Sequence, residues 1–80
     1  MNPKRKPDIY WSRYKGKIVT ETGYAFNETG SVIWELCDGS RTIEDIAAIL
    51  ANRFDIAKET AEEDVEEFIE EAKNLELILL

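Results

Sequence analysis

Few residues in this sequence have the types and spacings that support catalysis or metal binding. It contains no histidine, which removes the commonest general base at neutral pH and the commonest metal ligand. The single cysteine, Cys37, therefore has no imidazole partner with which to form a nucleophilic pair or a zinc site. A glycine-rich phosphate-binding loop is also missing. We expect a protein that is not an enzyme, with no catalytic residues, no metal and no other cofactor.

Cys37 and Ser40 are the two remaining candidates for a reactive or modified side chain. Cys37 falls on the apolar face of a predicted helix over Glu28–Cys37, which favours a small core residue over a reactive thiol. Ser40 would carry the prosthetic arm if the chain were an acyl carrier protein, another class of short, acidic, helical proteins. The sequence CDGSRT lacks the Asp-Ser-Leu pattern of that class, and N-terminal strands do not belong to it.

Length and charge limit the chain to one small, acidic domain. It has 80 residues and a net charge of −7. Residues 1–17 carry six basic residues and one acidic residue, a net charge of +5, whereas residues 18–80 carry four and sixteen, a net charge of −12. An acidic surface repels phosphate backbones and favours basic or neutral partners. We therefore expect no nucleic-acid partner.

The composition also predicts where the protein resides. No apolar run approaches the roughly 20 residues of a membrane span, so no membrane association is expected. The basic start MNPKRKPD has no apolar segment behind it, unlike a secretory signal. A single cysteine excludes an internal disulfide and fits a reducing compartment. These features indicate a cytoplasmic protein.

Three short strands are predicted in the first third of the chain. The sequence IYWSRY alternates in the manner of a strand, and Lys15-Gly16 is placed for a two-residue hairpin turn. A second strand is expected over residues 17–21, followed by a tight turn at Gly23. The third strand, Gly23–Phe26, has no charge or proline to blunt its free edge. In a meander order that edge is open to pairing.

Three helices are predicted after the strands. Asn27 is a good N-cap for the first, and Thr42 with Asp45 forms a capping box for the second. Apolar residues from Ile43 to Phe54 recur at helical spacing. The third helix is expected over Lys58–Asn74, with one apolar stripe and a glutamate-rich opposite face, and the tail LELILL should pack back or form a short strand. The predicted fold class is α+β, a three-stranded antiparallel meander followed by three helices (β-β-β-α-α-α).

The segment FNETGSVIWELCDGSRTIEDIAAILANRFDI, followed by AEEDVEEFIEEAKNLELI, resembles the PqqD-like family of peptide-recognition modules. The resemblance extends from about Pro7 to the end of the chain. It rests on the order and spacing of several pieces, namely Asn27-Glu28-Thr29, Ile33-Trp34, Asp38-Gly39, Thr42–Ala47, Phe54-Asp55, Asp64-Val65 and Phe68. Two residues depart from the family pattern: Phe26 stands where leucine is usual, and Asn74 where glycine often ends the third helix.

The resemblance implies a winged-helix-like fold and a non-catalytic function in the maturation of ribosomally synthesised peptides. The module is expected to capture the leader of a precursor peptide as an extra strand against the third strand, in a groove closed by the third helix. It would then present the peptide to a maturation enzyme, such as a radical SAM enzyme or a leader peptidase. The expected peptide-binding residues are Tyr24, Ala25, Phe26, Val65, Ile69 and Ala72.

Domain organisation and oligomeric state follow from the same interpretation. We expect residues 1–7 to form a flexible basic arm and residues 8–80 to form a single, monomeric recognition domain. The alternative function for a winged three-helix fold is DNA binding. The third helix would then read the groove, but it is rich in glutamate, whereas phosphate binding needs cationic contacts.

Overall fold

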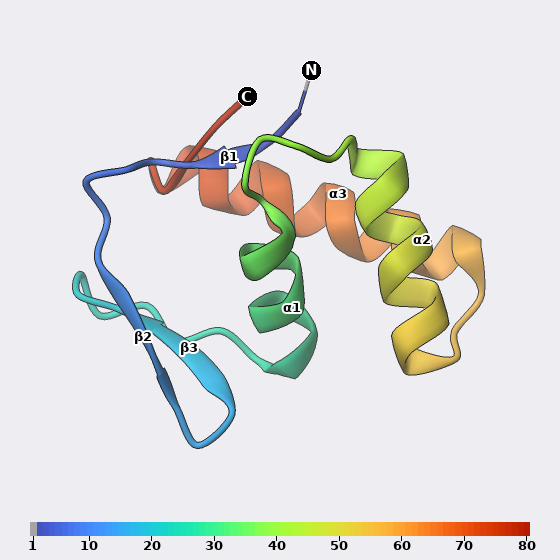
Figure 1. Ribbon diagram of the computed structural model, residues 1–80, viewed down its shortest axis with the longest axis horizontal. Coiled ribbons are helices and arrows are strands. Elements are labelled where there is room, and N and C mark those ends of the chain that lie inside the picture. Colours follow the sequence, from blue (N-terminus) through green and yellow to red (C-terminus); the bar gives the residue numbers. More distant parts are fainter. Residues whose placement is uncertain (1) are drawn as a thin grey trace.

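The computed structural model describes residues 2–80 as three helices with short antiparallel strands (Figure 1). This arrangement confirms the predicted α+β class. No helix in the part of the chain described here is long and apolar enough to cross a membrane. In chain order, the elements are β1 (Lys4–Arg5), β2 (Trp11–Tyr14), β3 (Lys17–Thr20), α1 (Glu28–Leu36), α2 (Ile43–Phe54), α3 (Lys58–Asn74) and β4 (Ile78–Leu79).

The predicted hairpin is formed by β2 and β3. Trp11 lies opposite Thr20, and Tyr14 lies opposite Lys17 beside the turn. Both turn residues have positive φ, 52° at Lys15 and 81° at Gly16. This backbone conformation matches the right-handed twist of the two strands, which is why a two-residue turn closes the hairpin here.

The predicted third strand is reduced to a single β-bridge, between Val19 and Ala25. The N–H of Thr20 donates to the carbonyl oxygen of Tyr24 at 2.8 Å, and the N–H of Phe26 donates to that of Ile18 at 3.0 Å. The chain leaves the hairpin after this bridge because α1 begins three residues after Ala25, at Glu28. The three-stranded meander is therefore a two-stranded hairpin with one bridged segment beside it.

A second small sheet joins the two ends of the chain, where β1 pairs antiparallel with β4. Lys4 lies opposite Leu79 and Arg5 opposite Ile78, and Pro3 is buried. Figure 1 shows β1 beside the C-terminal end of the chain, above α3 in this view. The segment that we expected to form a flexible arm is thus part of the fold from Pro3 to Arg5, because the apolar tail offers it a strand to pair with.

Arg5 also binds the end of α1. Its guanidinium donates to the carbonyl oxygens of Trp34 and Glu35, both at 2.8 Å, and lies 5.4 Å from the centre of the Trp11 ring. The last carbonyls of a helix lack intrahelical partners and carry partial negative charge, so a cation is stabilised there. This contact ties β1 to α1 and to the hairpin.

The helix starts follow the predicted capping chemistry. The side-chain oxygen of Asn27 accepts the N–H of Gly30 at 2.7 Å. Thr42 and Asp45 form the reciprocal capping box, with bonds of 3.0 and 3.1 Å. The bounds of α3 agree with the prediction, and α1 ends one residue earlier than expected, with Cys37 as its C-cap.

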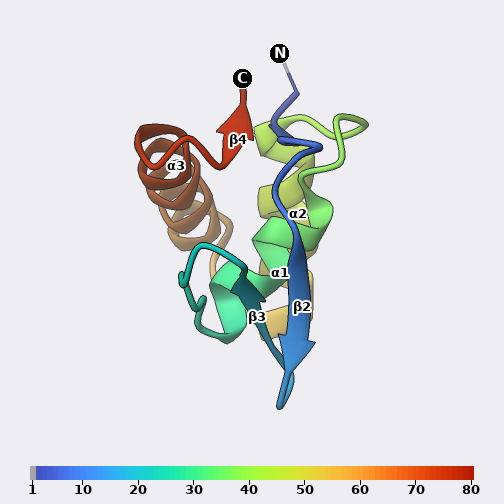
Figure 2. The same ribbon diagram turned by 90° about the vertical axis from the view of Figure 1, so that its left-hand side faces the viewer.

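The core lies between the three helices and the inner face of the hairpin. Trp34 from α1 is fully buried, as are Ile18 from β3 and Leu50 from α2. Figure 2 shows that the loop after β3 lies below α3 before it enters α1. This placement brings residues 24–27 next to the C-terminal half of α3, although they are distant in sequence.

Candidate peptide-binding groove

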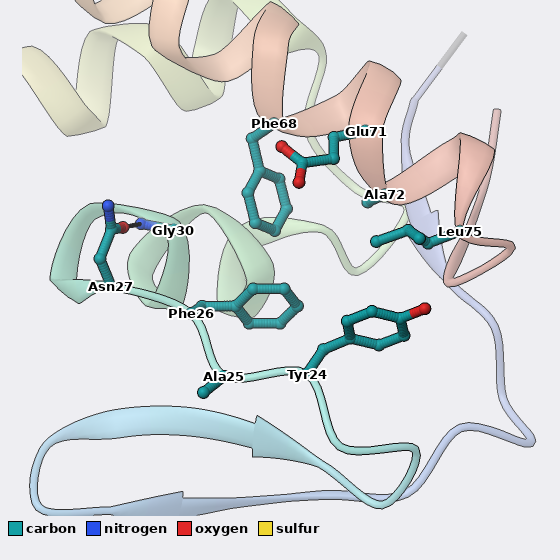
Figure 3. A pocket seen from close by; sticks show the side chains of 9 residues that line it. All are labelled: Tyr24, Ala25, Phe26, Asn27, Gly30, Phe68, Glu71, Ala72 and Leu75. Atoms are coloured by element: carbon teal, nitrogen blue, oxygen red, sulfur yellow. Dashed lines mark hydrogen bonds between the residues drawn. The ribbon is translucent and has the colours of Figure 1, made fainter.

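A groove separates the segment after β3 from the C-terminal half of α3 (Figure 3). We call it the Phe68 groove. Its cavity has a volume of about 230 Å³. It is lined by Tyr24, Ala25, Phe26, Asn27, Gly30, Phe68, Glu71, Ala72 and Leu75.

The free backbone edge of the groove belongs to Ala25. In the bridge with Val19, the paired hydrogen bonds are made by the neighbours Tyr24 and Phe26, whose groups point toward the hairpin. In this type of antiparallel pair, the N–H and C=O of the central residue point away from the partner strand. Neither group of Ala25 makes a hydrogen bond within residues 2–80. Ala25 therefore presents one free donor and one free acceptor.

Aromatic side chains form the inner wall of the groove. The Phe26 ring packs against two other rings, with 5.3 Å between its centre and that of Trp34 and 5.1 Å between its centre and that of Phe68. Figure 3 shows Phe68 and Leu75 pointing from α3 toward the rings of Phe26 and Tyr24. Tyr24 is 38% exposed at the mouth. One side of this wall therefore packs against the core, and its other side exposes apolar surface to the groove.

Gly30 keeps part of the groove open from the side of α1. A Cβ at this position would lie 3.1 Å from the side-chain oxygen of Asn27 and 3.3 Å from the Phe68 ring. Glycine within a helix costs roughly 0.5–1 kcal/mol relative to alanine. The close approach of Phe68 and the cap at Asn27 provide a structural reason for this glycine, and its small size leaves space in the groove.

The structure brings together four of the six residues predicted for the site. Tyr24, Ala25, Phe26 and Ala72 line the Phe68 groove. Val65 and Ile69, which we expected to contact the peptide, do not line it. Val65 is fully buried in the core, and Ile69 lies on another side of α3, beside Ile43 and Lys73.

The position of Val65 and Ile69 outside the groove has a geometric cause. One side of the apolar stripe of α3, which includes Val65, is packed in the core, whereas the other side meets the groove through Phe68, Ala72 and Leu75. Sequence analysis missed the five other lining residues. Two of them, Phe68 and Leu75, belong to the apolar stripe predicted for the third helix, which comprises Ala61, Val65, Phe68, Ile69, Ala72 and Leu75. The missed residues are Asn27, Gly30, Phe68, Glu71 and Leu75.

The side chains considered for chemistry lie outside the groove. The Ser40 hydroxyl donates to the Asp38 carboxylate at 2.5 Å, and hydrogen bonds from Ser40 lower the pKa of Asp38 to about 2. Within residues 2–80, no three His, Cys, Asp or Glu side chains are grouped to hold a metal ion. The groove itself offers hydrogen bonding and apolar contact.

Cys37 is fully buried, and burial raises the pKa of its thiol to about 12. Since the thiolate is the reactive form, we expect labelling of the native protein with a thiol reagent at pH 8 to be roughly a hundredfold slower than in denaturing urea. Labelling followed by absorbance in both states measures this ratio. Equal rates in both states would contradict the buried, protonated thiol.

The same shift predicts a loss of stability at high pH. The unfolded chain releases the thiol proton near pH 9, whereas the folded chain retains it to about pH 12. The folded state then binds more protons, so the free energy of unfolding should fall as pH rises above 9. A Cys37→Ala variant lacks this contribution and should lose less stability over the same pH range.

Comparisons with known proteins agree with this fold. A family model described as coenzyme PQQ synthesis protein D (PqqD) matches residues 11–78. A search of the curated proteins finds no match. One similar solved structure is TbiB1 in complex with the TbiA(beta) leader peptide, with 22% identity, a TM-score of 0.82, and coverage of 94% of this chain and 93% of that chain.

A second similar structure is the solution structure of the PqqD truncation of Methylobacterium extorquens PqqCD. It is described as a functional, stand-alone recognition element for ribosomally synthesised and post-translationally modified peptides. The identity is 14% and the TM-score 0.78, over 98% of this chain and 88% of that chain. At these identities, both structures establish a shared fold.

Proposed function

Because this chain belongs to the PqqD family, we propose that it is a peptide-recognition module that binds the leader segment of a ribosomally synthesised precursor. The leader adds as a strand beside Ala25, and its side chains enter the Phe68 groove. The module then presents the remainder of the precursor to a maturation enzyme, such as a radical SAM enzyme or a leader peptidase.

The free N–H and C=O of Ala25, next to an apolar groove, are the observation that carries this proposal. Recognition by strand addition gains affinity from main-chain hydrogen bonds and specificity from pockets for alternate side chains. The free edge is short, because in the segment Tyr24–Phe26 only Ala25 points its backbone N–H and C=O away from the hairpin. Most of the affinity should therefore come from side chains buried against Phe26, Phe68 and Leu75.

The presenting role requires no chemistry from this chain. Binding a leader and an enzyme together raises the effective concentration of the precursor at that enzyme. The DNA-binding alternative gains no support from the fold, because the face of α3 at the groove carries Glu71, and Glu67 is exposed beside it. Phosphate backbones would be repelled at that face.

Leader binding is tested with the precursor encoded beside the gene. We expect calorimetric titration of a synthetic leader of about 15–30 residues to give micromolar affinity or better, near −8 kcal/mol. Addition of the module should also accelerate modification of the full-length precursor by the neighbouring enzyme, while the module alone modifies nothing. The proposal is wrong if neither this leader nor that of any other neighbouring precursor binds.

A further inference from the structure

The Phe68 groove continues into a second cavity of about 240 Å³ between α1 and α3. Both cavities are lined by Asn27, Gly30, Phe68 and Glu71. The second adds Thr29, Ile33, Asp64 and Glu67. An extended peptide that enters beside Tyr24 and follows α3 toward its N-terminus therefore passes through both cavities.

The chemistry changes along this path. At the Tyr24 end, α3 contributes Ala72 and Leu75, which are apolar. At the other end, it contributes Asp64 and Glu67, with Glu71 between the two. The lining of the two cavities includes no lysine or arginine, and none of these three carboxylates forms a salt bridge within residues 2–80. Carboxylates that form no ion pair within the described residues thus border the groove at the end away from Tyr24.

The length of the path sets the number of side chains that it can receive. Asp64 and Leu75 are eleven residues apart on α3, which is about 16 Å along a helix. A strand covers that distance in about five residues at roughly 3.3 Å each, and alternate side chains point to the same side. Three side chains of a bound strand should therefore face α3.

We propose that the groove selects a leader segment of five residues. Counted from the Tyr24 end of the groove, its first and third side chains are apolar and its fifth is lysine or arginine. The apolar pair occupies the space between Tyr24, Phe68 and Leu75, and the cation lies beside Glu67 and Asp64. The pattern holds in either chain direction, because the N–H and C=O of Ala25 can pair with a parallel or an antiparallel strand. This inference rests on the proposed function and adds the chemical class of the ligand.

The test uses a displayed library of random twelve-residue peptides selected against the intact protein. We expect enriched peptides to share two apolar residues at alternate positions and a basic residue two positions before or after this pair, with the same order in all of them. One enriched peptide is then synthesised and titrated against the protein. Glu67→Lys should weaken its binding about fivefold or more, and replacing the basic residue of the peptide by glutamate should restore binding to this variant.

Glu66→Lys provides the matched control. Glu66 is an exposed neighbour of Glu67 on α3 but borders a different cavity, with Ile69 and Lys73. The net charge changes equally in both variants, so a general electrostatic effect would lower the peptide affinity of both to the same extent. We expect Glu66→Lys to retain most of the affinity.

The outcomes separate this inference from the function on which it rests. One outcome would overturn this inference alone: the enriched peptides bind and compete with each other but contain no preferred basic residue, and Glu66→Lys and Glu67→Lys weaken their binding equally. A library that yields no binding peptide, together with no binding of the neighbouring leader, would overturn the proposed function as well.

Discussion

Ala25→Pro should retain the fold and lose at least about tenfold in leader affinity. The N–H of Ala25 makes no hydrogen bond in the protein, so its loss removes nothing from the hairpin. An edge strand tolerates proline where the amide faces outward. The bound peptide loses one main-chain hydrogen bond and meets the proline ring at the point of contact. Calorimetric titration with the leader measures the loss, and far-UV circular dichroism checks the fold.

Neighbouring positions distinguish this effect from general damage to the segment. Proline at Phe26 removes the bond to the Ile18 carbonyl, and proline at Tyr24 removes the bond from its N–H to the Thr20 hydroxyl. Both changes should lower thermal stability, whereas Ala25→Pro should not. Ala57→Pro is the matched control, because Ala57 has a φ of −62° that suits proline and lies at the start of α3, away from the groove.

Hydrogen exchange provides an independent measure of the same pairing. The Ala25 amide should exchange quickly in the free protein and become protected when leader is added, whereas the Phe26 amide should be protected in both states. If leader binds Ala25→Pro with wild-type affinity, strand addition at this edge is excluded, even if the groove remains the binding site.

Local chemistry made the helices predictable from sequence. Asn27, Thr42 and Asp45 each satisfy a helix N-terminus through atoms within three residues, so their roles follow from spacing alone. The turn at Lys15-Gly16 is local in the same sense. Pairing of β1 with β4 joins residues more than seventy positions apart, and no sequence pattern within two-residue strands specifies such a contact.

The Phe68 groove was only partly predictable, because its residues are brought together by contacts between segments that are distant in sequence. The sequence indicated that the segment Tyr24–Phe26 has a free edge, but the outward residue depends on the register of its bridge to Val19. On α3, the sequence defined an apolar stripe without showing which part of it faces other helices. Val65 faces the core and Phe68 the groove because α1 and α2 cover only one side of the stripe.

Trp34→Ala should cause the largest loss of stability among single substitutions in α1. Trp34 is the largest fully buried side chain, and truncation of such a residue typically costs about 3–5 kcal/mol. A domain of this size has roughly 4–12 kcal/mol of total stability, so the loss removes a large share of it. Urea denaturation followed by circular dichroism measures the change.

The same substitution should also affect the groove, because the Trp34 ring packs against the Phe26 ring, which in turn packs against Phe68. Trp34→Phe separates the two effects. The Trp34 Nε1 atom has no hydrogen-bond partner within residues 2–80, so phenylalanine loses no hydrogen bond and leaves a smaller cavity. We expect it to lose less than half as much stability as Trp34→Ala and to keep most of the leader affinity. If Trp34→Phe keeps its stability but loses leader binding, Trp34 acts on the peptide more directly than through the position of the Phe26 ring.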